Sequence, residues 1–128
     1  MERRALQIIL TLIACVPVLA GGAGVLLGPA LNGVAEAGPA AESHFRYLSG
    51  LLLAIGLAYW SCVPAIETKS APLTLLTAIV FIGGLGRAYG WIVAGPPTLA
   101  HQAALVIEVA IAPAMWFWQR RVAGATVW

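Results

Sequence analysis

Four apolar segments, each long enough to cross a bilayer, constrain this chain more than any other feature. A membrane-spanning helix needs about 20 mainly apolar residues, and four segments reach that length: Ala5–Leu27, Phe45–Ala65, Pro72–Gly95 and Ala100–Trp118. The breaks between them are rich in Gly, Pro and small polar residues, which is typical of loops. We therefore predict a single all-α membrane domain, an up-down-up-down four-helix bundle with both termini on the same side.

The composition excludes an ordinary soluble domain. Only 9% of the 128 residues are charged and 61% are hydrophobic, whereas a soluble domain has about a quarter charged residues. The net charge of +2 is too small to favour nucleic acid as a partner. Membrane lipids are therefore the expected surroundings.

The N-terminal segment also carries two features of targeting signals. The stretch LIAC, which ends at Cys15, resembles a lipoprotein-processing box, and VLAGG resembles a signal-peptidase site. We expect a retained first helix instead, because the apolar run continues to Leu27 and is long enough to span a membrane. Cys15 and Cys62 lie at different positions in their segments and lack the spacing of metal ligands, so no disulfide or metal site is predicted.

The basic residues near the segment ends predict an orientation. Lys and Arg accumulate on the cytoplasmic side of membrane helices. In an up-down-up-down arrangement, five of the seven basic residues fall on the side that carries both termini, namely Arg3, Arg4, Lys69, Arg120 and Arg121. Both termini are therefore expected in the cytoplasm.

Arg87 lies deep inside the otherwise uncharged segment Pro72–Gly95. Arg87 and Glu108 are each about eight residues from the outer end of their segments, which places both about 12 Å deep. The connection GPPTL is short, so the last two segments are expected to be antiparallel neighbours. Because an unpaired charge at that depth costs at least about 2.5 kcal/mol, we predict that Arg87 pairs with Glu108 inside the membrane.

Other polar and aromatic residues share an expected position in the outer half of their segments. His101 and Glu108 are seven residues apart and lie on one helix face. The predicted ligand-binding set is Arg46, Arg87, Glu108, His44, His101, Tyr47 and Trp91. The histidines fit solvated interfacial positions better than a metal or haem pair, because no third ligand has diagnostic spacing. No arrangement of catalytic residues is visible, so the sequence favours a protein that is not an enzyme.

Glycines and prolines inside the segments predict local geometry. Gly86 and Gly90 form a G-x-x-x-G pair, which favours close helix packing within the bundle first and contact between copies of the chain second. Pro17 and Pro113 indicate bends, which membrane helices tolerate. The tail is expected to fray, with Trp128 at the interface.

The stretches MERRALQ, HFRYLSG and GGLGR, a glutamate in the last segment and a WQRR tail follow one another over nearly the whole chain. This pattern resembles an uncharacterised bacterial family of four-helix membrane proteins, the domain of unknown function 4345. The resemblance implies a bacterial inner-membrane protein without an assigned activity. It also implies that the polar positions marking the family are His44, Arg46, Gly84, Arg87 and Glu108. The architecture has a looser likeness to DoxX-type membrane proteins, some linked to quinone-dependent oxidoreductases.

The leading functional hypothesis is binding of a hydrophobic or amphipathic ligand in an outward-facing polar pocket. A quinone, a fatty acid or an isoprenoid lipid would fit, and no other cofactor is predicted. Arg87 and Arg46 would engage its anionic or carbonyl head, while Glu108 would neutralise and orient Arg87. Trp91 and Tyr47 would wall the apolar part. The alternatives are a structural or accessory subunit of a larger membrane complex and, third, a proton-coupled carrier that works as a dimer.

Overall fold

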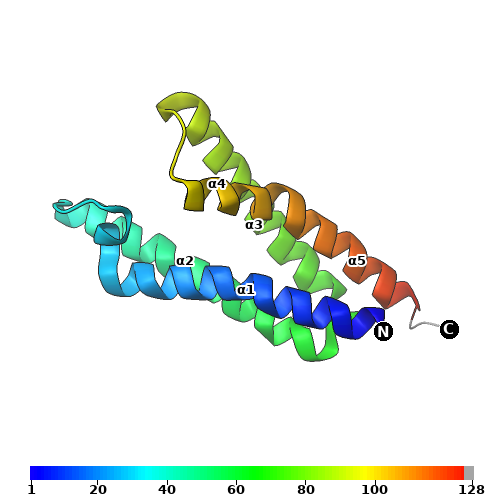
Figure 1. Ribbon diagram of the computed structural model, residues 1–128. Coiled ribbons are helices and arrows are strands. Elements are labelled where there is room, and N and C mark those ends of the chain that lie inside the picture. The colour runs from blue at the N-terminus through cyan, green and yellow to red at the C-terminus, as the bar shows by residue number, and fades with distance from the viewer. Residues whose placement is uncertain (126–128) are drawn as a thin grey trace. The chain divides into compact units, whose positions relative to one another are not determined.

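The computed structural model describes residues 1–125, which form helices and no strand (Figure 1). In chain order the elements are α1 (Glu2–Leu27), the 3-10 turn η1 (Gly28–Asn32), α2 (Pro39–Cys62), the 3-10 turn η2 (Val63–Thr68), α3 (Ser70–Ala94), α4 (Leu99–Val106), the π-helical turn η3 (Ile107–Ile111) and α5 (Ala112–Ala125). Four stretches within this range are long and apolar enough to cross a membrane: Glu2–Asn32, Pro39–Thr68, Ser70–Ala94 and Leu99–Ala125. The prediction of an all-α membrane protein with four such helices is confirmed.

The helices extend beyond the apolar segments that predicted them. α2 begins at Pro39, earlier than expected, because proline suits the first helical position and Gly38 takes the extended N-cap conformation. The predicted first loop is therefore partly helical. The last helix continues to Ala125, beyond the apolar segment that ends at Trp118. Trp128, predicted at the interface, falls outside the described residues.

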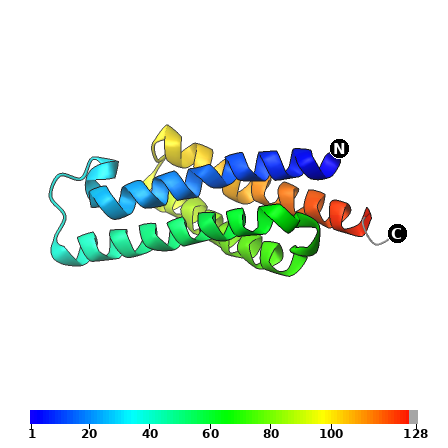
Figure 2. The same cartoon turned by 90° about the horizontal axis from the view of Figure 1, so that it is seen from below.

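The chain divides into two compact units. The α1–α2 unit comprises Gln7–Pro64, and the α3–α5 unit comprises Met1–Leu6 together with the chain from Ala65 onward. Within the first unit, α1 and α2 lie side by side along their lengths in both views (Figures 1 and 2). Each unit has its own close helix contacts and its own polar contacts.

Glycines allow the close packing of the α1–α2 unit. A Cβ added at Gly21 would lie 2.7 Å from the carbonyl oxygen of Ser49 and 2.8 Å from the Cα of Leu53. On the facing helix, a Cβ added at Gly56 would lie 2.6 Å from Cγ2 of Val18. Small residues let membrane helices approach each other in this way. The contact is therefore between backbones, with little side-chain volume separating them.

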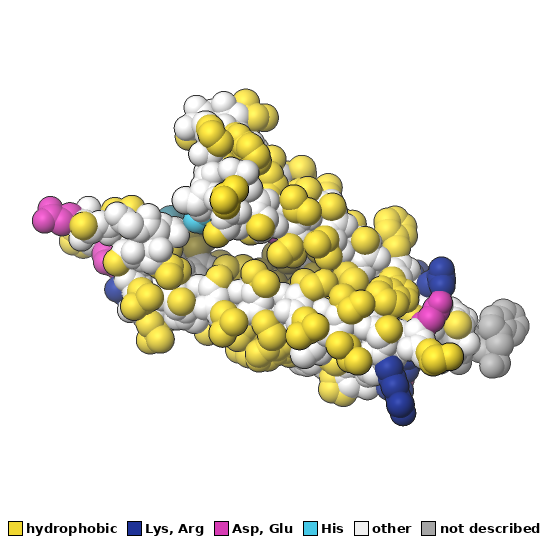
Figure 3. Space-filling model, in the orientation of Figure 1, with side chains coloured by type: hydrophobic (Ala, Val, Ile, Leu, Met, Phe, Trp, Pro, Cys, Tyr) yellow, Lys and Arg dark blue, Asp and Glu magenta, His cyan; other side chains and the backbone are white. Residues whose placement is uncertain are grey.

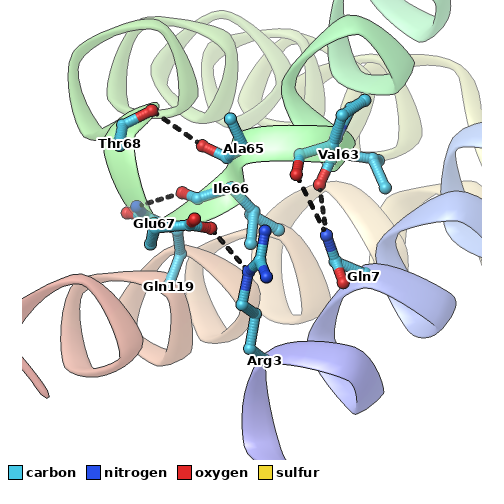
Figure 4. Close-up of polar contacts among 9 residues, drawn as sticks. Arg3, Gln7, Val63, Ala65, Ile66, Glu67, Thr68 and Gln119 are labelled. Carbon is cyan, nitrogen blue, oxygen red and sulfur yellow. Dashed lines mark hydrogen bonds and ion pairs between the residues drawn. The ribbon is translucent and has the colours of Figure 1, made fainter. Parts of the chain in front are cut away.

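Polar side chains connect α5 to η2 and to the start of α3 in the α3–α5 unit. Gln119, only 1% exposed, donates from Nε2 to the carbonyl oxygen of Ile66 at 2.8 Å and to Ser70 Oγ at 3.0 Å. Trp116 Nε1 donates to Thr74 Oγ1 at 2.7 Å. Figure 4 shows Gln119 pointing toward η2, whose carbonyl it satisfies. These bonds fix the register of α5 against α3.

Two ion pairs join the first residues of the chain to the same unit. Arg3 Nε lies 2.7 Å from Glu67 Oε2 (Figure 4), and Arg121 Nη2 lies 2.5 Å from Glu2 Oε1. These contacts place the N-terminal residues, η2 and the last turns of α5 at one end of the α3–α5 unit.

Candidate functional site

Arg87 and Glu108 form a two-pronged ion pair in the α3–α5 unit. Arg87 Nε donates to Glu108 Oε2 at 2.9 Å, and Arg87 Nη2 donates to Oε1 at 2.8 Å. Such a fork between a guanidinium and a carboxylate is stronger and more directional than a single neutral hydrogen bond. The side chains of Arg87 and Glu108 are 28% and 15% exposed, so part of the pair is accessible from outside the protein. The structure thus brings together the two residues that the sequence predicts to pair.

Gly84, one helical turn before Arg87, permits this close approach of α3 to η3. A Cβ added at Gly84 would lie 2.8 Å from the Cβ of Glu108 and 2.8 Å from Cγ1 of Val109. Carbon atoms pack best at about 3.5 to 4.0 Å, so a larger residue at this buried position would push Glu108 away from Arg87. Gly84 is therefore a positioning residue for the pair.

We expect Gly84→Ala to lower the free energy of unfolding by about 1 to 3 kcal/mol, the usual effect of overpacking a tight core. Gly83→Ala is the matched control, because a Cβ added there meets nothing within 4 Å. Alanine is favoured over glycine in a helix by about 1 kcal/mol, so the control should be neutral or slightly stabilised. Thermal unfolding of both variants in one detergent measures the difference. Equal melting temperatures would contradict the close approach at Gly84.

Glu108 lies in a widened helical turn. At the end of η3 the N–H of Ala112 donates to the carbonyl of Ile107, five residues earlier. The physical cause is Pro113, which has no N–H and whose ring clashes with the carbonyl four residues earlier in a regular α-helix. A π turn before the proline relieves this clash, and such turns are frequent at functional sites. The sequence predicted only a bend at Pro113, and the wider turn at Glu108 was missed.

Two other predicted site residues of this unit lie near the connection between α3 and α4. His101 Nδ1 is hydrogen-bonded to Thr98 Oγ1 at 2.7 Å. Thr98 is the N-cap of α4, and His101 lies three residues further on in the first turn of that helix. Trp91, near the end of α3, is 37% exposed. The hydrogen bond of His101 thus goes to the helix start and not to the Arg87–Glu108 pair.

Arg46 donates hydrogen bonds to a carboxylate and to two backbone carbonyls within the α1–α2 unit. Its Nε donates to Glu42 Oε2 at 2.9 Å, and its Nη1 donates to the carbonyl oxygens of Val25 and Leu26. These carbonyls belong to the last turn of α1, where they have no partner inside the helix and where the helix dipole favours a cation. Arg46 therefore caps α1, a role that the sequence analysis did not assign to it.

His44 and Tyr47 lie in the first turns of α2, and both are exposed. Within residues 1–125, no three His, Cys, Asp or Glu side chains are close enough together to hold a metal ion. Cys15 and Cys62 are free thiols, and Cys15 Sγ donates to the carbonyl of Thr11 at 3.3 Å.

Gln119 is a buried polar residue that the sequence analysis did not single out. Its Oε1 is the one buried side-chain polar atom without a hydrogen-bond partner in the part of the chain that the structure describes, although buried polar atoms normally have one. Gln119 follows Met115 by four residues and therefore shares its buried helix face. The four-residue spacing from Met115 could have identified Gln119 as a buried residue. The predicted segment, however, ended at Trp118, one residue before it.

A family model described as Domain of unknown function (DUF4345) matches residues 5–119 of the chain. The matched range includes the Arg87–Glu108 pair, Gly84 and the Arg46 cap. Comparisons with curated proteins and with solved structures gave no match. The match shows the family of the chain. It does not test the looser likeness to DoxX-type proteins, which stays a prediction.

Proposed function

Because the chain belongs to the family of the domain of unknown function DUF4345, whose description assigns no activity, we propose a function from the site alone. The proposal is a membrane protein that binds a hydrophobic or amphipathic ligand through the guanidinium of Arg87. We place it in the bacterial inner membrane with cytoplasmic termini. The support for this orientation is the set of basic residues around η2 and the N-terminus, since such residues accumulate on the cytoplasmic side.

The unused donors of Arg87 carry the proposal. A guanidinium has five N–H donors, and Glu108 takes two of those of Arg87. No other acceptor for Arg87 lies among the described residues. The Arg87 side chain is 28% exposed, and its remaining donors could hydrogen-bond an oxygen of a ligand head. An arginine whose only role was to neutralise Glu108 would not need N–H donors that a ligand can reach.

The charge balance of the pair favours a carbonyl head over an anionic one. Arg87 and Glu108 together are neutral, so a carbonyl oxygen can bind without leaving a net charge in apolar surroundings. A carboxylate would leave one negative charge, which is costly at membrane depth. A quinone or another carbonyl-bearing lipid therefore fits better than a fatty acid. Trp91, on the same helix as Arg87, is proposed to contact the apolar part.

Arg46 is left out of the proposed site. Glu42 and two carbonyls of α1 already accept hydrogen bonds from Arg46, which leaves it fewer donors for a ligand. His44 and Tyr47 belong to the same helix start as Arg46. The proposal therefore depends on residues of the α3–α5 unit alone.

Mass spectrometry of lipids extracted from the purified protein tests the proposal. We expect one ligand class to be enriched over bulk phospholipid in the wild type, and to fall about tenfold or more in the double variant Arg87→Gln with Glu108→Gln. This magnitude follows because hydrogen bonds to charged groups are worth about 1.5 to 3 kcal/mol. The matched control, Arg46→Gln with Glu42→Gln, removes an ion pair of the same composition and should keep the ligand.

Two results would contradict ligand binding at Arg87. One is a wild-type preparation that carries only bulk phospholipid. The other is a specific ligand that both double variants retain at the wild-type level. Circular dichroism shows whether each variant is folded, so loss of ligand is distinguished from loss of structure.

A structural or accessory subunit is the second candidate, and one observation favours it. Gly83, Gly86 and Gly90 on α3 are exposed, and an added Cβ at any of them meets nothing within 4 Å. Such a face can accept another helix at close range. Co-purification with one membrane protein at a fixed ratio, with no enriched lipid, would favour this function over ligand binding. The proton-coupled carrier stays third, without an observation of its own.

A further inference from the structure

One end of the α3–α5 unit carries an excess of positive charge. It is the end where the N-terminal residues, η2 and the last turns of α5 meet. Its basic side chains are Arg3, Arg4, Lys69, Arg120 and Arg121, and its acidic side chains are Glu2 and Glu67. These leave a formal excess of three positive charges. Figure 3 shows dark blue Lys and Arg side chains near the N-terminal end of the chain.

The two acidic side chains of this end are already paired, with Arg3 and with Arg121. Arg4, Lys69 and Arg120 therefore have no carboxylate partner among residues 1–125. Arg4 and Arg120 are exposed and Lys69 is half-buried. The excess charge thus resides on three accessible cations.

Two aromatic side chains of α5 lie at the same end of the unit, beside Glu2 and Arg121. Phe117, 65% exposed, and Trp118 line a shallow groove together with Glu2 and Arg121. Aromatic and basic residues occur together at the boundary between membrane and water, where the rings meet the lipid and the cations meet the headgroups. The stretch Leu99–Ala125, to which the aromatic pair belongs, is long and apolar enough to cross a membrane.

We propose that this basic end binds the headgroup of an anionic phospholipid. Arg4, Lys69 and Arg120 attract the phosphate, and Phe117 and Trp118 contact the start of the acyl chains in the groove. The occupant is a lipid and not a soluble phosphate, because the aromatic wall offers apolar contact that a free phosphate cannot use. This site is separate from the Arg87–Glu108 pair, so neither proposal depends on the other.

The test is native mass spectrometry of the purified protein titrated with dioleoyl phosphatidylglycerol or dioleoyl phosphatidylcholine. We expect tighter binding of the anionic lipid by the wild type. A basic residue near an anionic lipid surface contributes about 1 kcal/mol, or about fivefold in affinity. The variant with Arg4→Gln, Lys69→Gln and Arg120→Gln should therefore bind phosphatidylglycerol at least about tenfold more weakly, with its phosphatidylcholine affinity unchanged.

Two single variants test the proposal even if the triple variant does not fold. Glu2→Gln releases Arg121 from its exposed partner, so we expect phosphatidylglycerol affinity to rise about fivefold. Arg46→Gln removes one positive charge from the α1–α2 unit and should leave this affinity within twofold of the wild type. Inorganic phosphate at the concentration of the lipid should not displace it.

Three results of the lipid titrations would overturn the proposal. They are equal affinities of the wild type for the two lipids, a folded triple variant with wild-type affinity, and an unchanged affinity of Glu2→Gln. Displacement of the lipid by inorganic phosphate would also overturn it, because it would show a phosphate site without a lipid contact.

Discussion

Replacing Arg87 alone by leucine is expected to lower the free energy of unfolding by about 3 kcal/mol or more, because Glu108 then keeps a charge without its partner. Glu108→Leu alone should have a similar effect, since it leaves the guanidinium unpaired. The double variant Arg87→Leu with Glu108→Leu should lose far less, because apolar groups that replace both partners are tolerated. Thermal unfolding of the four proteins in one detergent gives the coupling energy as a double-mutant cycle.

The pair Glu2–Arg121 is the control for this cycle. Its side chains are 57% and 73% exposed, and exposed ion pairs contribute about 1 kcal/mol or less. Single and double leucine variants at Glu2 and Arg121 should therefore differ little from the wild type. Additive effects of Arg87→Leu and Glu108→Leu, with no recovery in the double variant, would contradict the pairing.

Gly21→Ala is expected to destabilise the protein by about 3 kcal/mol, at the upper end of the range for overpacking. The neighbours of an added Cβ are the backbone atoms of Ser49 and Leu53, and backbone cannot rotate aside as a long side chain can. α1 and α2 would have to separate along part of their contact. The melting temperature in detergent measures this loss.

Gly22→Ala is the matched control for Gly21→Ala. The two glycines are neighbours in α1, and a Cβ added at Gly22 meets nothing within 4 Å. Because alanine is the better helix former, Gly22→Ala should be neutral or slightly stabilising. If Gly22→Ala lost as much stability as Gly21→Ala, the backbone contact at Gly21 would not be the cause of the loss.

The four long helices were predictable from the sequence, because an apolar segment long enough to cross a membrane is sufficient to identify each of them. About 20 apolar residues without a break can satisfy their backbone hydrogen bonds in lipid only as a helix. The helix ends were harder to predict, because they depend on local capping and not on hydropathy. Pro39 and Gly38 start α2 inside a stretch that is too polar to count as a span. The η2 turn, where Ala65 leaves the helical conformation, falls at the end of the apolar segment Phe45–Ala65, but hydropathy does not predict its 3-10 form.

The pairing of Arg87 with Glu108 was predictable because two opposite charges at equal depth in neighbouring helices have little choice of partner. The close approach of Gly84 to η3, which lets the pair form, was not predictable. Gly83 and Gly84 are adjacent glycines of one stretch, yet only Gly84 faces η3, and the sequence does not fix the rotation of α3. The cap formed by Arg46 was missed for a related reason, since its acceptors are carbonyl groups, which every residue has.

The cap at the end of α1 has a consequence for biosynthesis. Arg46 follows Val25 and Leu26 by 21 and 20 residues, so their carbonyls cannot reach it while α1 is the only part of the chain that has left the ribosome. Backbone groups without partners are costly in lipid. Until Arg46 has been synthesised, these two carbonyls lack the partner that they have in the folded chain, and we expect water or the insertion machinery to hydrogen-bond them. The shortest nascent chain that can complete α1 from its own residues ends at Arg46, inside the next helix.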